Sequence, residues 1–176
     1  MRVSHEQLNT ELVHQHRHVE AIMLGVENAQ GALRHEAFDQ LRQYLAAHEA
    51  AEQEFLHEPA RGELDEHRGI VESRVQEEDD IAEMMRGLER LSPESVEFTA
   101  LFKETTERIR THMQAEEHQE MAAVARALQP DQLEAAMTAL EQVAALSEDA
   151  IEDASFDDWL DRARDTFHGR RQVGTR

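Results

Sequence analysis

Residues 8–26 read LNTELVHQHRHVEAIMLGV, and their apolar side chains recur at steps of three and four residues. This spacing turns one face of a helix towards the protein interior. The resulting stripe contains Leu8, Leu12, His16, Val19, Met23 and Val26. Because a buried imidazole without a partner is costly, the histidine in this stripe needs an explanation.

Three further segments show the same spacing, at residues 36–57, at residues 62–91 and from Pro93 onward. Short connections separate the segments at Gly31, around Pro59 and Gly62, and at Ser92-Pro93. Four amphipathic helices with short joins must bury their stripes against one another. The sequence therefore predicts an all-α, up-down antiparallel four-helix bundle, which we assign to residues 1–128.

The chain continues beyond the bundle with a second amphipathic region. After Pro130 the stripe includes Leu133, Leu140 and Val143, and Ser155 is placed to cap a short last helix. We expect residues 129–168 to form a helical C-terminal extension packed on the bundle. The polar residues 169–176 are expected to form a flexible tail.

Composition excludes several functions. The 176 residues include 38 acidic and 18 basic side chains, a formal net charge of −20, and no cysteine. Such a charge repels phosphate backbones and anionic lipids, so neither nucleic acid nor membrane is an expected partner. Thiolate chemistry is impossible without cysteine. The absence of an apolar leader or membrane span favours a cytoplasmic location. A monomer or homodimer is expected, with small molecules as its partners.

Ionisable residues at inward positions of all four bundle segments call for a common explanation. They are His16, His48, Glu52, Glu78, His112 and Glu116. The step of four in the pairs His48/Glu52 and His112/Glu116 places a nitrogen and an oxygen donor on one helix face. Carboxylates can bridge two cations while histidines bind one each. We therefore predict a dinuclear metal centre, with iron preferred over manganese or zinc.

Other acid and histidine pairs are predicted to lie outside this centre. The Glu-x-x-His pairs Glu11/His14 and Glu54/His57 should point outward, which disfavours a ferritin-like site. Glu20 lies at the edge of its stripe as a possible outer acceptor for His16. We expect a surface location for the other histidines, His5, His14, His18, His35, His57, His118 and His168.

Three sequence segments resemble the hemerythrin-like, HHE cation-binding family. They are LVHQHRHVEAIM in the first helix, LAAHEAAEQEFLHEP in the second and IRTHMQAEEHQEM in the fourth. The resemblance covers about residues 8–125 and implies a metal-binding bundle with His16 as a ligand. The family usually has a histidine in its third helix, where this chain has Glu78. Residues 130–176 fall outside the resemblance.

The third-helix ligand has several alternatives. Glu77, Asp80 and His67 are alternatives to Glu78, and a further alternative is that the acidic run at residues 77–80 is a solvated face with no ligand role. Arg74 lies one turn before Glu78 and either pairs with that carboxylate or extends to solvent.

The anionic residues suggest the chemistry. Tyr44 precedes His48 by four residues, so its phenol could reach a metal on the same face. In this interpretation Glu52 and Glu116 bridge two irons, the three histidines are terminal ligands, and Glu78 and Tyr44 complete the set. Such hard anions favour a diferric pair sharing an oxo or hydroxo bridge. We expect peroxide decomposition, with Glu78 and Tyr44 as catalytic ligands and nitric oxide as a possible further substrate.

Two alternatives remain open at this point. The first is a carrier or sensor that binds O2, nitric oxide or iron without turnover. The second is a metal-free helical interaction bundle.

Overall fold

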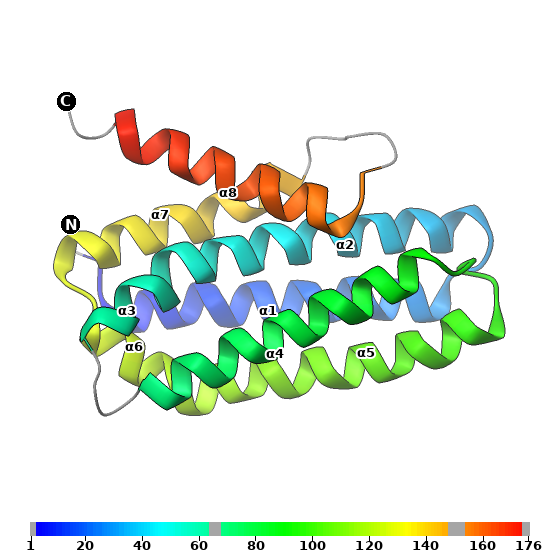
Figure 1. Cartoon of the computed structure of the whole chain (residues 1–176), viewed down its shortest axis with the longest axis horizontal. Coiled ribbons are helices and arrows are strands. Elements are labelled where there is room, and N and C mark those ends of the chain that lie inside the picture. The colour runs from blue at the N-terminus through cyan, green and yellow to red at the C-terminus, as the bar shows by residue number, and fades with distance from the viewer. Residues whose placement is uncertain (1–2, 64–67, 148–153, 174–176) are drawn as a thin grey trace.

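Four long helices run antiparallel to one another in the computed structural model (Figure 1), which describes residues 3–63, 68–147 and 154–173. No β-strand occurs among these residues. The four helices are α1 (His5–Asn28), α2 (Ala32–Glu52), α4 (Arg68–Glu89) and α5 (Val96–Ala115). The predicted all-α bundle is thereby confirmed.

Two of these helices continue through a wide π-helical turn. α2 leads through η1 (Gln53–His57) into α3 (Glu58–Glu63), and α5 leads through η2 (Glu116–Glu120) into α6 (Met121–Ala127). The predicted connection around Pro59 and Gly62 is therefore wrong at Pro59, because the helix continues to Glu63. The wider turn directly before Pro59 relieves the usual clash between a proline ring and the preceding turn, so the helix continues.

The helix starts show how local sequence sets the joins. Ser4 and Gln7 form a capping box at α1, and Gly31 begins α2 with a φ of 57°. The last bundle helix begins at Val96 rather than at Pro93, because residues 92–95 form a turn first. Ser95 then caps α5 by accepting the Phe98 N–H at 3.0 Å.

The C-terminal extension consists of α7 (Pro130–Ser147) and α8 (Phe156–Val173), which lie along α2 (Figure 1). α7 is anchored by Gln15, whose side-chain amide donates to the Leu140 carbonyl at 2.8 Å. The ring of Phe167 in α8 packs edge-to-face on Phe55. α8 extends to Val173, so the first residues of the predicted tail are helical instead.

The bundle interior differs between its two ends. At one end Phe38, Phe98 and Phe102 pack as a buried aromatic cluster, with ring centroids 5.0–6.4 Å apart. The other end holds the charged residues described below. None of the described helices is both long and apolar enough to span a membrane.

Candidate metal centre

Nine ionisable side chains are buried together at the end of the bundle that contains the two π turns. None of them is more than 3% exposed. They include all six residues predicted from the helix stripes and three more, and the full set is His16, His48, Glu49, Glu52, His57, Glu78, His112, Glu116 and Glu120. Burial of so many charges without cations would be very unfavourable.

Their donor atoms converge in three groups whose members lie within 4.8 Å of one another. The first contains His16, His48, Glu52 and Glu116. The second contains Glu49, Glu52, Glu78 and His112. The third contains His57, Glu116 and Glu120. Because Glu52 belongs to both of the first two groups, its carboxylate is placed to bridge two neighbouring cations.

Three histidines are oriented by hydrogen bonds on their outer nitrogen. The Nδ1 atoms of His16, His48 and His112 contact Glu117 at 2.8 Å, Gln15 at 3.0 Å and Glu77 at 3.1 Å, respectively. The Nε2 atom of each ring is buried and has no hydrogen-bond partner. An imidazole held in this way presents its second nitrogen as a metal ligand.

The inner atoms approach one another without forming hydrogen bonds. The Nε2 atoms of His16 and His112 lie 3.3 and 3.1 Å from oxygens of Glu116, and that of His48 lies 3.5 Å from Glu52. Both oxygens of Glu52 and of Glu116 also lack a hydrogen-bond partner. Nitrogen and oxygen donors that meet at such distances fit bound cations, and iron, manganese and zinc all accept this set.

The shifted pKa values show that the charged forms of several of these buried groups are unfavourable without cations. Burial, together with the nearby His16, lowers the pKa of His48 to about 3. Burial and Glu78 raise the pKa of Glu49 to about 8. For His112, burial opposes the charged form, but Glu116 outweighs it and raises the pKa to about 10. A bound cation would displace the protons that Glu49 and His112 hold at neutral pH.

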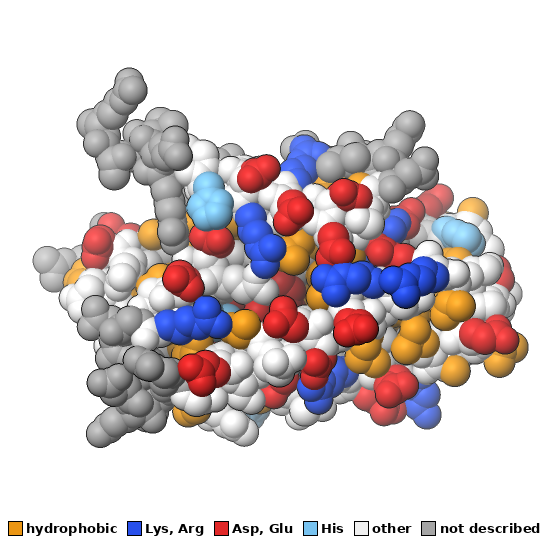
Figure 2. Space-filling model, in the orientation of Figure 1, with side chains coloured by type: hydrophobic (Ala, Val, Ile, Leu, Met, Phe, Trp, Pro, Cys, Tyr) orange, Lys and Arg blue, Asp and Glu red, His pale blue; other side chains and the backbone are white. Residues whose placement is uncertain are grey.

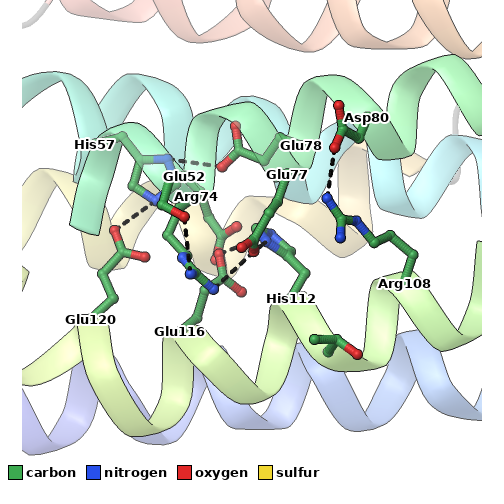
Figure 3. A network of polar contacts seen from close by, with 12 residues as sticks. Glu52, His57, Arg74, Glu77, Glu78, Asp80, Arg108, His112, Glu116 and Glu120 are labelled. Atoms are coloured by element: carbon green, nitrogen blue, oxygen red, sulfur yellow. Dashed lines mark hydrogen bonds and ion pairs between the residues drawn. The ribbon is translucent and has the colours of Figure 1, made fainter. Parts of the chain in front are cut away.

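His57 is buried, so the prediction that it points outward is wrong. Its Nδ1 lies 2.9 Å from Glu78 and its Nε2 lies 3.0 Å from Glu120 (Figure 3). The reason is the π turn at residues 53–57. In an α-helix, five residues overshoot one turn by about 140°, whereas the wider π turn returns His57 to the inward face below Glu52.

Glu49 and Glu120 were not predicted either, although the sequence contains a signal for both. Glu120 follows Glu116 by four residues and so continues the His112/Glu116 stripe. Glu49 lies in residues 44–52, which are buried on every side because α7 and α8 cover the outer face of α2. The alanines around Glu49 made this part of α2 apolar all round, as expected for a fully buried helix.

Within the acidic run of α4, Glu78 is the residue that faces the bundle interior. Glu77 instead contacts His112 and the Arg74 guanidinium, the latter at 2.8 Å. Asp80 pairs with Arg108 near the surface (Figure 3). Arg74 is thus buried against Glu77 rather than paired with Glu78 or extended to solvent. His67 lies outside the described residues.

The outer acceptor of His16 also differs from the prediction. Glu20 forms an ion pair with Arg110 at 3.0 Å, and Glu117 contacts His16 in its place. The remaining predicted surface histidines are exposed as expected, namely His5, His14, His18, His35, His118 and His168.

Tyr44 is buried beside the first helix. Its ring packs against the His18 ring with centroids 4.5 Å apart. Burial and the charge of Glu11 raise its pKa to about 12. Both effects oppose a phenolate. Ligation of a metal by Tyr44 stays a prediction from the sequence.

The family comparison covers most of the bundle. The hemerythrin HHE cation binding domain matches residues 7–124. Comparison with curated proteins and with solved structures gives no match. The matched region contains all nine buried ionisable residues and the four bundle helices apart from the first two residues of α1. The chain therefore belongs to the hemerythrin HHE cation-binding family.

Proposed function

We propose that this chain is a non-haem di-iron protein that decomposes hydrogen peroxide. The observation that carries the proposal is the high carboxylate content of the two donor groups that share Glu52. Together they contain Glu49, Glu52, Glu78 and Glu116. Four carboxylates balance the roughly four positive charges of two ferric ions joined by an oxide. Glu49 thus supplies the anionic charge that the sequence interpretation assigned to Tyr44.

Iron bound here would act as a Lewis acid and as a redox centre towards peroxide. The protein's part is to hold the ligands in place. Glu78 is held by the Gln53 amide, which donates to one oxygen at 2.6 Å, and by His57, which lies 2.9 Å from the other. Ligands fixed in this way keep their geometry when a small molecule binds.

The test is oxygen release from added peroxide by iron-loaded protein, measured with an oxygen electrode. His112→Ala removes an inner nitrogen donor, and we expect it to lose most of the activity and part of the bound iron. His118→Ala is the matched control. His118 lies six residues after His112, is exposed, and contacts only the Gln114 carbonyl among the interactions described. It should retain both.

Two other outcomes would contradict the proposal. Iron-loaded protein that changes its absorption spectrum reversibly with O2 or nitric oxide, yet releases no oxygen from peroxide, would be a carrier or sensor. Protein that holds no transition metal after purification without chelator would be a metal-free bundle.

A further inference from the structure

A cavity of about 330 Å³ connects the face of α8 with the buried donor groups. Its lining includes Glu49 and Glu78 from the centre and Asp157, Asp161 and Arg164 from α8. A second cavity, of about 530 Å³, shares Gln53 and Arg164 with it and reaches His57. The C-terminal extension thus forms one wall of an opening to the site, although it lies outside the matched family region.

The inner end of this cavity contains an unsatisfied carboxylate. Glu49 is 3% exposed, and neither of its side-chain oxygens has a hydrogen-bond partner. Glu49 also belongs to the second donor group. A buried carboxylate without a partner is costly, so its position at the end of a cavity indicates that a cation reaches it there.

The outer part of the cavity is acidic. Asp79 and Asp161 are exposed, and Asp161 lies 3.6 Å from the Arg164 guanidinium. Asp157 is neutralised by Arg86, which donates to it at 2.8 and 3.0 Å. Figure 2 shows acidic side chains around the basic ones on the face that carries α4 and α8. A cleft with more carboxylates than guanidinium groups attracts cations and raises their local concentration.

Arg164 and Gln53 both line the cavity between its acidic rim and the donors. Arg164 donates to the Gln53 side-chain oxygen, and the Gln53 amide donates to Glu78. This chain of contacts ties α8 directly to a carboxylate of the centre. It also places a positive charge across the path, where it would repel an approaching cation until the link opens.

We propose that this cavity is the route by which Fe2+ enters the centre, with the Arg164–Gln53 link as its latch. The proposal rests on the proposed di-iron centre and adds to it the path of the metal. The acidic rim collects the ion, and Glu49 receives it once Arg164 has moved aside. No redox step is needed for this transfer.

Stopped-flow measurement of Fe2+ uptake by metal-free protein tests the route. In the double variant Asp79→Asn/Asp161→Asn we expect uptake at low salt to slow by roughly three- to tenfold. The difference should shrink at high salt, because salt screens exposed charges. The final number of irons bound should not change.

The control removes the same charge elsewhere. Asp131→Asn/Glu134→Gln alters two exposed acids on α7 and should leave the uptake rate close to that of the wild type. If both double variants slow uptake equally, the net charge of the protein explains the effect and the route is wrong.

The latch has its own test. Arg164→Gln should speed both uptake and the release of iron to a chelator several-fold, at unchanged iron stoichiometry. Gln53→Ala breaks the same link from the other side and should give the same acceleration. Unchanged rates in both variants would refute the latch while leaving the centre intact. Wild-type protein that binds no iron at equilibrium would overturn the di-iron proposal and the route with it.

Discussion

The two ends of this bundle bury side chains of opposite chemical character. At one end Phe38, Phe98 and Phe102 form an aromatic cluster, and the Arg34 guanidinium covers the Phe98 ring at 5.2 Å. At the other end nine ionisable groups share the interior. Burial of each aromatic ring contributes about 1.5–3 kcal/mol to stability, whereas unpaired buried charges reduce it.

The difference separates the source of stability from the source of function. The apolar end can hold the fold together whether or not a cation is bound. The polar end contributes to the stability of the folded state only when cations neutralise its carboxylates. Substitutions at the two ends should therefore have opposite effects on stability and on metal binding.

The largest effect is expected at the apolar end. Phe98→Ala leaves a cavity in the aromatic cluster and should lower the free energy of unfolding by about 3–5 kcal/mol, with or without iron. Chemical denaturation of both forms measures it. Val96→Ala, two residues earlier at a side chain that is 81% exposed, is the control and should change little. A loss seen only in the metal-free form would show that the two ends are not independent.

At the polar end, Glu52→Gln should stabilise metal-free protein while weakening iron binding. Burial, followed by Glu116 and Glu49, raises the pKa of Glu52 well above its usual value, so the folded state keeps a proton that the unfolded state releases above about pH 4.5. Stability is therefore lost as pH rises, by about 1.4 kcal/mol per unit. Glutamine carries no titratable proton and so avoids this loss.

Denaturation of metal-free protein at pH 4.5 and pH 7 separates this explanation from better packing. The gain should be present at pH 7 and absent at pH 4.5, where the unfolded carboxylate is protonated too. The exposed Glu107→Gln serves as a control for charge removal. Equal gains at both pH values would contradict the explanation.

Iron affinity should rise with pH because cations displace protons from the polar end. Without metal, the pKa of His112 is about 10 and that of Glu49 is about 8, so both hold a proton at neutral pH. Each proton released adds about a tenfold gain in affinity per pH unit. The dependence should be steepest below pH 8 and weaker between pH 8 and 10. Chelator competition from pH 6 to 9 measures it, and a flat profile would refute proton release.

The smallest effect is expected from Tyr44→Phe. The phenol lies beside His18 and Glu11, and the four carboxylates of the centre supply its negative charge without it. Iron content and the visible absorption spectrum of the variant should match those of the wild type. Loss of a phenolate-to-iron charge-transfer band in Tyr44→Phe would instead establish Tyr44 as a ligand.

Helix periodicity alone was enough to find most of the polar end. His16, His48, Glu52, Glu78, His112 and Glu116 all occupy inward positions at steps of three and four, and all six are buried together. The step is a local property of an α-helix, so it needs no knowledge of neighbouring helices. The same reasoning predicted the antiparallel bundle and the helical extension after Pro130.

Residues that do not follow ideal helical periodicity could be placed only from the tertiary structure. His57 becomes an inward residue only because the turn before Pro59 widens into a π-helix, and such a turn has no clear sequence signature. The partner of His16 depended on which acid of a neighbouring helix came closest, whereas Arg74 pairs with Glu77 of its own helix. The position of α8 over Glu49 and Gln53 likewise follows from packing between segments about 110 residues apart in the chain. Local sequence thus determined which face of each helix turns inward, whereas contacts between helices decided which polar groups meet there, because those contacts depend on the final packing of the whole chain.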